Sequence, residues 1–205
     1  SVIKDVSSSL EMENVLFKIT RSAAELVGGN GASIAFYNEE GQFVTYPYHF
    51  NLPDKCKEII TGKDQGLAGQ IIETGKSAII DNYPGYSGAL KEFIAAGCKV
   101  LIGVPLITRG KTMGVLLVFS TFEEKHFTEH DMALLEGIGQ EAAIAIENAT
   151  LYKDLEQMLI STITTLASMI DAKSPWTRGH SERVTRYAVE IGRAMGLNEH
   201  EIQTL

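Results

Sequence analysis

Cysteine is scarce in this sequence, and the chain also lacks any long apolar run. Its 205 residues include only two cysteines, Cys56 and Cys98, which are far apart and not in a metal-ligand spacing. A small secreted protein stapled by disulfides would contain more of them, so we expect two free thiols and a reducing, cytoplasmic compartment. No apolar stretch approaches the roughly 18 residues of a membrane-spanning helix, and residues 1–10 show no signal-peptide pattern.

Basic residues are outnumbered, since 18 Lys and Arg stand against 26 Asp and Glu and give a net charge of −8. Nucleic-acid backbones are bound by basic stripes, and none is visible, so we expect no nucleic-acid polymer as a partner. The hydrophobic fraction of 44% is typical of a globular protein with one core of about 150 residues and a remainder. The chain begins with Ser1 and ends in a helical pattern, so we expect a piece excised from a longer protein.

The first 120 residues alternate between helical and strand patterns. Apolar residues at helical spacing predict a helix over residues 10–27, ended by the glycine-rich segment 28–31. Two hairpins, a short helix and one further strand are predicted after it. They are strands 32–37 and 43–50, helix 67–74, strand 77–81, and strands 100–108 and 112–120.

A long helix is predicted next. Thr128, followed three residues later by Asp131, resembles a capping box, and no Pro or Gly-Gly pair interrupts the chain before residue 173. Such a helix would be on the order of 60 Å long. Its second half carries an apolar 3-4 repeat typical of a coiled-coil seam, formed by Tyr152, Leu155, Leu159, Ile163, Leu166 and Ile170. We therefore expect a parallel homodimer; alternatively, residues 159–170 belong to the core of a following domain.

Five short motifs indicate a family for the first part of the chain. They are GLAG at 66–69, IIDN at 79–82, GVPL at 103–106, GVL at 114–116 and FTEHD at 127–131. In order and spacing they resemble GAF domains, which are small-molecule sensors built on an antiparallel sheet flanked by helices. The resemblance covers about residues 10–150. It implies an α+β, PAS-like fold with a long exit helix and a short all-α C-terminal piece.

The glycines of these motifs have a structural interpretation that we favour over ligand contact. Gly66 and Gly69 would let the backbone turn tightly before the short helix. Gly103 and Gly114 lie inside predicted strands, where a missing side chain usually marks the close approach of a neighbour. Pro105 lacks an N–H donor, so its strand should be unpaired on one side there.

A second resemblance begins near residue 159. The segment 168–188, with GHSERV at 179–184 after Asp171-Ala172-Lys173, is similar to the opening of HD-GYP domains, which are cyclic di-GMP phosphodiesterases of the HD superfamily. The two resemblances together imply three parts: a GAF domain over residues 1–150, a connecting helix over 151–172, and an incomplete HD-GYP domain over 173–205. Helices are predicted over residues 181–195 and from Asn198 onward.

The resemblance implies metal chemistry for a complete HD-GYP domain and none for this chain. In that family, divalent Fe or Mn ions activate water, and the His matching His180 is the first metal ligand. Trp176 stands where some members carry a further carboxylate ligand, which favours a two-metal centre. The remaining ligands have no match here, so we expect no enzyme activity from these residues. The pair His130-Asp131 precedes His180, which is the wrong order, and Asp131 is better explained as a helix N-terminal charge.

The GAF ligand is not identified by the sequence. Phe127 and Asp131 fit a cyclic-nucleotide pattern, but Met132 breaks it. Cys98 precedes a buried strand and suits packing better than bilin attachment, and haem binding through His49 has no further support. The default pocket is lined by aromatic and acidic residues: Tyr46, Tyr48, Asp81, Tyr86 and Phe93. We expect a sensor that regulates an attached phosphodiesterase; the alternative is a GAF domain without ligand that serves dimerisation alone.

Overall fold

The computed structural model describes residues 2–53, 56, 58–172, 180–198 and 201–202, with side chains described for 13–53, 56, 58–169, 183–198 and 201–202. The chain forms two compact units, one of residues 10–147 and one of residues 1–9 with 148–205. Helices α1 (Val2–Leu26) and α4 (Glu129–Ala172) each contribute to both units.

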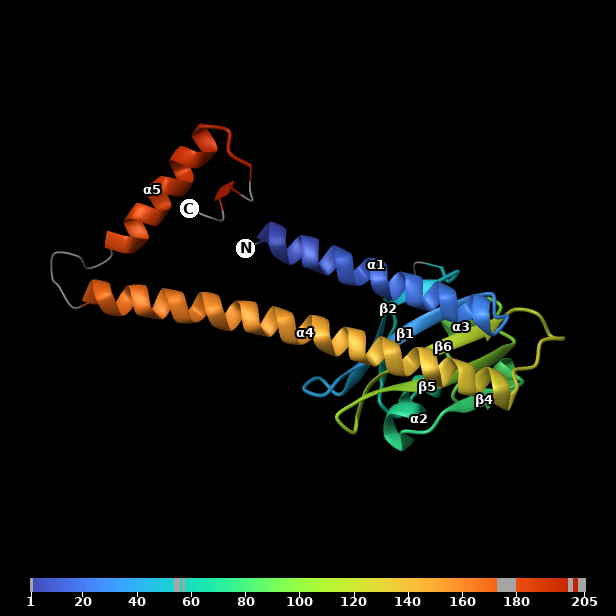
Figure 1. Ribbon diagram of the computed structural model, residues 1–205. Helices are drawn as coiled ribbons and strands as arrows, with labels where there is room; N and C mark the ends of the chain where they lie inside the picture. Colours follow the sequence, from blue (N-terminus) through green and yellow to red (C-terminus); the bar gives the residue numbers. More distant parts are fainter. Residues whose placement is uncertain (1, 54–55, 57, 173–179, 199–200, 203–205) are drawn as a thin grey trace. The chain divides into compact units, whose positions relative to one another are not determined.

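An antiparallel sheet of six strands forms the centre of the 10–147 unit (Figure 1). The strand order is β3-β2-β1-β6-β5-β4, so each predicted hairpin pairs neighbouring strands and β1 pairs with β6 between them. The strands are β1 (Gly31–Asn38), β2 (Phe43–Phe50), β3 (Ile60–Gly62), β4 (Ala78–Ile80), β5 (Val100–Thr108) and β6 (Lys111–Ser120).

Both faces of the sheet are buried. Side chains alternate along β5, so Ile102 packs in the cluster that contains α1 and α4, while Leu101 packs in the cluster on the opposite face. On that opposite face lie α2 (Gly66–Thr74), a 3-10 turn η2 (Tyr83–Gly85) and α3 (Lys91–Ala95). The predicted α+β fold, an antiparallel sheet flanked by helices, is confirmed. Strand β3 and helix α3 were not predicted.

The expected roles of the glycines and of Pro105 are confirmed. A Cβ on Gly69 would lie 2.2 Å from the carbonyl oxygen of Lys63, and one on Gly114 would lie 2.4 Å from the carbonyl oxygen of Ala35. One on Gly103 would lie 2.6 Å from a methyl carbon of Ile71. Pairing of β5 with β4 ends at Gly103, so Pro105 has a strand partner only on the β6 side.

Turn and cap residues agree with the sequence pattern. Helix α1 ends with Gly28 in the left-handed region at a φ of 67°, and Gly29 donates a 2.8 Å hydrogen bond to the carbonyl of Ala24. In the β5–β6 hairpin, Arg109 and Gly110 have φ values of 48° and 77°. Two successive positive φ values are typical of the tight hairpin turn whose twist matches the strands.

The predicted capping box at the start of α4 is confirmed. The carboxylate of Asp131 accepts hydrogen bonds from the amide and the hydroxyl of Thr128 at 2.8 and 2.9 Å, and the Asp131 amide donates to the Thr128 hydroxyl at 3.2 Å. Burial raises the pKa of Asp131, but these hydrogen bonds outweigh it and the net pKa is lowered. Asp131 therefore acts as a helix N-terminal charge, as predicted.

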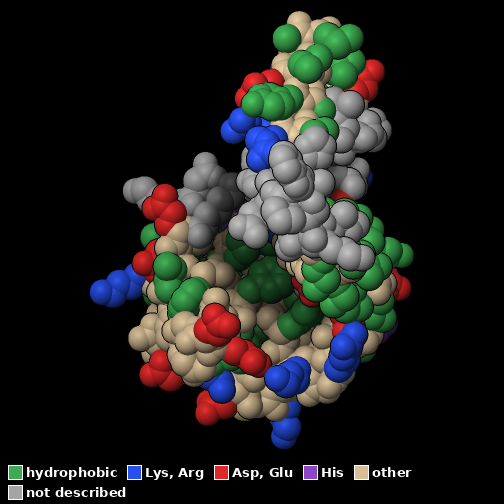
Figure 2. Space-filling view, turned by 90° about the vertical axis from the view of Figure 1, so that its left-hand side faces the viewer, with side chains coloured by type: hydrophobic (Ala, Val, Ile, Leu, Met, Phe, Trp, Pro, Cys, Tyr) green, Lys and Arg blue, Asp and Glu red, His purple; other side chains and the backbone are tan. Residues whose placement is uncertain are grey.

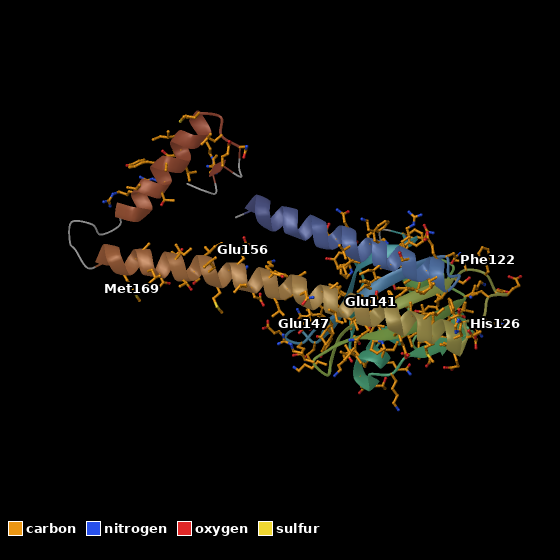
Figure 3. All side chains as sticks on the ribbon, in the orientation of Figure 1. Phe122, His126, Glu141, Glu147, Glu156 and Met169 are labelled. Carbon is orange, nitrogen blue, oxygen red and sulfur yellow. The ribbon has the colours of Figure 1, made fainter. Side chains whose placement is uncertain are left out.

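The second half of α4 presents an exposed apolar face. Leu155, Leu159, Ile163 and Leu166 of the predicted seam are each more than half exposed, and Met169 (Figure 3) is 64% exposed. The hydroxyl groups in this stretch instead bond to the helix itself. Each donates to the carbonyl four residues earlier at 2.8–2.9 Å, and they belong to Thr162, Thr164, Thr165 and Ser168.

Helix α5 (His180–Ala194) is amphipathic and lies in the second unit. It ends at Gly196 with a φ of 78°, where the amide of Leu197 donates to the carbonyl of Gly192. Asn198 and Glu201 then exchange side chain to backbone hydrogen bonds, as expected for a helix start at Asn198. Hydrophobic side chains gather on the part of the molecule at the top of Figure 2. The exposed large hydrophobic residues of α5 are Val184, Tyr187 and Ile191.

Candidate ligand site

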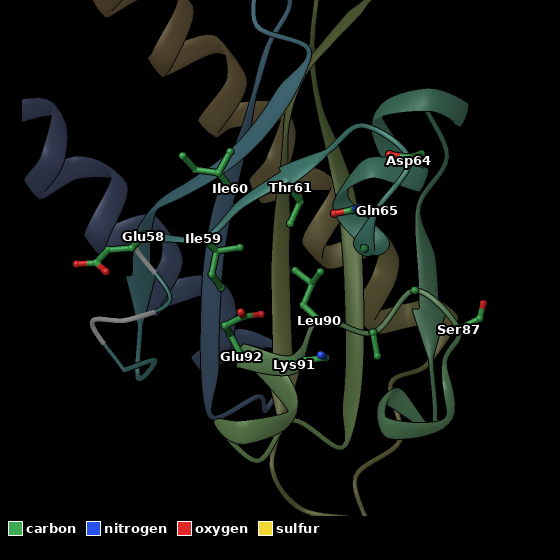
Figure 4. A pocket seen from close by; sticks show the side chains of 13 residues that line it. Glu58, Ile59, Ile60, Thr61, Asp64, Gln65, Ser87, Leu90, Lys91 and Glu92 are labelled. Carbon is green, nitrogen blue, oxygen red and sulfur yellow. The ribbon is translucent and has the colours of Figure 1, made fainter.

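A cavity of about 620 Å³ opens beside β3, on the sheet face that carries α2 and α3 (Figure 4). One wall is formed by residues 58–61 and the turn 64–66 that leads into α2, and the other by the segment 87–92 that leads into α3. A volume of this size falls within the range of small-molecule pockets. The cavity is therefore the candidate site of the 10–147 unit.

Gly66 lets the backbone lie directly over the inner end of this cavity. It has a φ of 72°, a left-handed conformation that favours glycine, and it begins α2. A Cβ at this position would lie 3.4 Å from the hydroxyl of Tyr46 and 3.5 Å from the side chain of Leu90. Gly66 and Leu90 both line the cavity, so the Tyr46 hydroxyl lies immediately behind its lining.

Two buried hydroxyl groups at this inner end lack hydrogen-bond partners among the described residues. Tyr46 on β2 is 1% exposed and Thr61 on β3 is 6% exposed, and neither hydroxyl oxygen has a partner. Burial raises the pKa of Tyr46 to about 12; the nearby Thr61 hydroxyl opposes this rise, and the negative charge of Glu92 adds to it. Thr61 therefore lies near Tyr46, but the contact lacks the geometry of a hydrogen bond.

The neighbouring aromatic side chains are well packed and, where polar, hydrogen-bonded. The ring of Phe93 lies edge-on to Tyr46 at 5.8 Å and is 6.2 Å from Tyr83. The Tyr83 hydroxyl accepts a 3.0 Å hydrogen bond from the amide of Leu90, and burial raises the pKa of Tyr83. Tyr86 donates to the side chain of Gln70 at 2.8 Å. The unpaired hydroxyls of Tyr46 and Thr61 differ from these satisfied neighbours.

The outer part of the cavity carries charged side chains. Glu58, Asp64, Lys91 and Glu92 are exposed residues of its lining. Figure 4 shows Glu92 on the same side of the cavity as Leu90, while the carboxylate of Glu58 points away. Glu92 is the acidic residue whose charge acts on Tyr46. A molecule in the cavity would therefore meet the hydroxyl of Thr61 and, elsewhere in the lining, exposed charged side chains.

The five residues of the predicted pocket do not lie together. Tyr46, Tyr86 and Phe93 belong to the face that carries the cavity. Tyr48 lies on the other face, where its ring packs edge-on to Phe36 at 5.9 Å. Asp81 is an exposed residue whose carboxylate lies 3.4 Å from a ring nitrogen of His126, which Figure 3 labels. The cavity is lined by residues that neighbour Tyr86 and Phe93 in sequence rather than by the five themselves.

Both cysteines are free and buried in the cluster beneath the cavity face. Burial raises the pKa of Cys98 to about 12, and burial with the negative charge of Glu92 raises the pKa of Cys56. Thiols in such surroundings stay protonated near neutral pH and are poor nucleophiles. Cys98 thus packs in the core. His49, the residue considered for haem, is 8% exposed on β2.

Within the described residues, no three His, Cys, Asp or Glu side chains lie close enough to share a metal ion. His180 begins α5, but its side chain and the whole of Trp176 lie outside the described parts. Across the same ranges, no helix combines the length and apolar composition needed to cross a membrane.

With the fold and the cavity established, comparison with known families decides the assignment. The family model of the GAF domain matches residues 9–147, which contain the whole sheet and the cavity. The chain belongs to the GAF domain family. Its GAF domain is a regulatory sensor domain, a type that is generally non-catalytic.

Solved structures agree with the GAF fold at low sequence identity. The GAF domain of a phosphoenolpyruvate-protein phosphotransferase from Coxiella burnetii has a TM-score of 0.62 at 18% identity, covering 70% of this chain and 86% of that one. A GAF domain/HD domain protein from Geobacter sulfurreducens has a TM-score of 0.59 at 14% identity, covering 68% and 94%. Free methionine-R-sulfoxide reductase from Neisseria meningitidis, in complex with its substrate, has a TM-score of 0.60 at 16% identity, covering 69% and 81%.

Sequence reasoning missed Thr61 and Glu92. Thr61 lies on a strand of three residues, too short to show alternation, and Glu92 lies on a helix of five residues. A usable signal existed in the GLAG motif, because Gly66 marks the point where the backbone covers Tyr46. A second signal was the short segment between Tyr86 and Phe93, which had to lie near both.

Proposed function

We propose that this GAF domain is a small-molecule sensor whose ligand enters the cavity beside β3 and hydrogen-bonds the hydroxyl of Thr61, near which the hydroxyl of Tyr46 lies. The observation that carries the proposal is a pair of buried hydroxyls that lack hydrogen-bond partners among the described residues, one on Thr61 in the cavity lining and one on Tyr46 behind it. A buried polar group without a partner costs about 1–3 kcal/mol, so cores normally replace it with an apolar one. A ligand that supplies the missing partner explains why both hydroxyls are present.

Binding is favoured over thiol chemistry at this site. A reductase with the same fold is known in complex with its substrate, so this fold can hold a small molecule. Reduction by a protein thiol would need a reactive thiolate. The thiols of Cys56 and Cys98 are buried with raised pKa values, which favours an unreactive role.

Native mass spectrometry of the purified chain tests the proposal. We expect a co-purified small molecule in the unaltered protein and its loss from the Tyr46→Phe/Thr61→Val double variant. Tyr48→Phe is the matched control, because it removes a tyrosine hydroxyl from the same strand on the opposite face. A protein that purifies empty as a dimer and gains no ligand from a metabolite extract would favour the alternative of a GAF domain that serves dimerisation alone.

We also propose that the GAF domain regulates an HD-GYP phosphodiesterase domain that begins near residue 173. The match of the segment 168–188 to the opening of such domains supports this, as does the name of the GAF domain/HD domain protein with the same fold. In the complete domain, His180 would be the first ligand of a divalent Fe or Mn centre, which supplies activated water. Testing it requires a longer chain with the complete domain, in which we expect His180→Ala to lower metal content and phosphodiesterase activity.

Helix α4 is the connection through which the ligand would act. Its first part is tied to the sheet by a 2.6 Å hydrogen bond from Ser77 to Glu136 and by a 2.5 Å ion pair between Arg109 and Glu147, a residue labelled in Figure 3. Glu147 is the last residue of the 10–147 unit. A ligand that binds one arrangement of the sheet more tightly than another would shift the position of α4 through these two contacts. A ligand with equal affinity for both arrangements would not change the position of α4.

The exposed apolar face of α4 supports the proposed parallel homodimer. Leu155, Leu159 and Leu166 are each more than half exposed, and a face of this kind is typical of a helix that packs against another. We expect sedimentation to show a dimer at tens of micromolar and Leu159→Lys to shift it toward monomer. Lys153→Gln, outside the seam, is the control and should leave the dimer intact.

A further inference from the structure

The inference concerns the chemical class of the ligand and rests on the sensory site proposed above. We propose that the ligand presents an anionic oxygen, of a carboxylate or a phosphate group, to the N-terminal end of α2 and to the hydroxyl of Thr61. Oxygens of both groups are strong acceptors for N–H and O–H donors.

The N-terminal end of α2 lacks the groups that usually complete a helix start. Gln65 at the N-cap makes no side-chain capping hydrogen bond in the part of the chain that the structure describes, and no acidic residue lies in the first turn. The first N–H groups of a helix have no partner within it and carry a partial positive charge. Gly66, Leu67 and Ala68, which begin this helix, are buried. A buried helix start of this kind needs an acceptor from elsewhere.

This helix start lies in the wall of the cavity, next to Thr61. Gln65 and Gly66 both belong to the lining. Strand β3 is joined to α2 by a turn in which the amide of Gln65 donates to the carbonyl of Gly62 at 3.1 Å, and the amide of Gly62 donates to the Gln65 side chain at 3.4 Å. Thr61 directly precedes this turn, and Figure 4 shows the side chain of Gln65 extending toward it. Thr61 and the helix start therefore share one wall of the cavity.

The hydroxyl of Thr61 is a second, independent sign of a ligand. Thr61 is 6% exposed and lines the cavity, and its hydroxyl oxygen has no hydrogen-bond partner among the described residues. Figure 4 shows its side chain directed from β3 into the cavity. A hydroxyl can donate one hydrogen bond. One oxygen of a carboxylate or phosphate could accept from Thr61 while another accepts from the first N–H groups of α2.

Two carboxylates of the lining, on Asp64 and Glu92, are placed away from these donors. Figure 4 shows Glu92 at the other end of the cavity from Thr61, with Leu90 between them. Asp64 lies against Gly62, where a Cβ would be 2.6 Å from its carboxylate oxygen. Both carboxylates are exposed to water, which screens their charge, whereas the helix start and Thr61 are buried. The buried donors therefore decide which group the ligand presents at this point.

Four probes with a phenyl body and different head groups test the inference. They are 3-phenylpropionate, phenyl phosphate, 3-phenylpropanamide and 2-phenylethylamine, titrated into the intact chain at pH 7 and followed by ¹H–¹⁵N NMR. We expect at least one anion to bind about fivefold more tightly than the neutral amide, and the amine to bind most weakly. The largest shifts should fall on the amides of Gly66, Leu67 and Ala68. The tighter of the two anions identifies the source of the oxygen.

Two substitutions with matched controls locate the anion. Thr61→Val should weaken the bound anion by at least about threefold, and Thr74→Val, which removes a hydroxyl from the other end of α2 outside the lining, should leave it unchanged. Gln65→Asp places a carboxylate at the N-cap, whose backbone already has the extended conformation that capping requires. This carboxylate should compete for the same N–H groups and repel the anion, lowering its affinity about tenfold. Gln65→Asn caps without a charge and should lower it less.

Failure of this inference can be distinguished from failure of the sensory site. If the amide or the amine binds as tightly as both anions, or if Gln65→Asp leaves the anion affinity unchanged, the anion assignment is overturned. The site itself stands in that case, provided that Thr61→Val weakens whichever probe binds. If no probe binds even at high millimolar concentration, the anion assignment is also overturned. The sensory site then depends on the molecule found by native mass spectrometry.

Discussion

Removing the hydroxyl of Tyr46 should have opposite effects on ligand binding and on the stability of the protein without ligand. Tyr46→Phe keeps the ring and its 5.8 Å edge contact with Phe93 but removes a buried group without a partner. An unsatisfied buried polar group costs about 1–3 kcal/mol, and the nearby Thr61 hydroxyl places this case at the low end. We therefore expect the variant without ligand to be more stable than the natural sequence by about 1 kcal/mol. Its midpoint of thermal unfolding should rise by about 3–5 °C for a unit of this size.

Urea unfolding followed by circular dichroism measures this difference. A change in stability should move the midpoint while the slope with denaturant stays constant. Tyr83→Phe is the matched control, since it removes the same group from the same face, but this hydroxyl accepts a 3.0 Å hydrogen bond from Leu90. The control should lose about 1 kcal/mol. Equal destabilisation by both variants would show that Tyr46 is satisfied in the folded protein and would remove the basis of the proposed site.

The remaining predictions concern pH, packing and catalysis. The pKa of Tyr46 is about 12 in the folded protein and near 10 in the unfolded chain, so the free energy of unfolding should fall by roughly 3 kcal/mol as the pH rises from 10 to 12. Tyr46→Phe should remove this fall from a plot of stability against pH. Gly69→Ala should destabilise by more than about 2 kcal/mol because its Cβ meets a backbone carbonyl, whereas Gly137→Ala, in a helix with open space, should stabilise by about 0.5–1 kcal/mol. Equal changes in the free energy of unfolding of the two variants, measured by chemical unfolding, would contradict the close contact at Gly69 and the open space at Gly137. This chain should not hydrolyse cyclic di-GMP with added Mn²⁺ or Fe²⁺, and His180→Ala should change its unfolding free energy by less than about 0.5 kcal/mol; turnover that persists through repurification would refute the first expectation.

Much of the fold could be predicted because its signals are local. Glycines at positive φ ended α1 and formed the β5–β6 turn, and the Thr128 and Asp131 spacing placed the start of α4. Strand β3 and helix α3 could not be found this way. They have three and five residues, shorter than the period that distinguishes a helix from a strand. Their positions are fixed by pairing with β2 and by packing on the sheet, which are contacts between distant parts of the chain.

The candidate site was less predictable than the fold for a related reason. Residues two apart on a regular strand share a face, so Tyr46 and Tyr48 were expected together. The register of the β1–β2 pairing shifts between Thr45 and Tyr48, and this irregularity leaves the two tyrosines on opposite faces. Regular alternation along β2 could not have separated them, and it does not say which face carries a cavity. That depends on where α2 and the segment 87–92 stop covering the sheet. The predicted roles of His180 and of the HD-GYP segment stay predictions.

The hydroxyl groups along the second half of α4 have a consequence for what can lie against that helix. Thr162, Thr164, Thr165 and Ser168 each use their only proton on a carbonyl of the same helix. These donors therefore do not need hydrogen bonds from water, and a surface that packs against them would displace little bound water. A partner surface that covers these four residues therefore leaves none of their hydroxyl donors without a hydrogen bond. A helix of this composition tolerates neighbours on more than one side and could be enclosed in a bundle as readily as paired along a single seam.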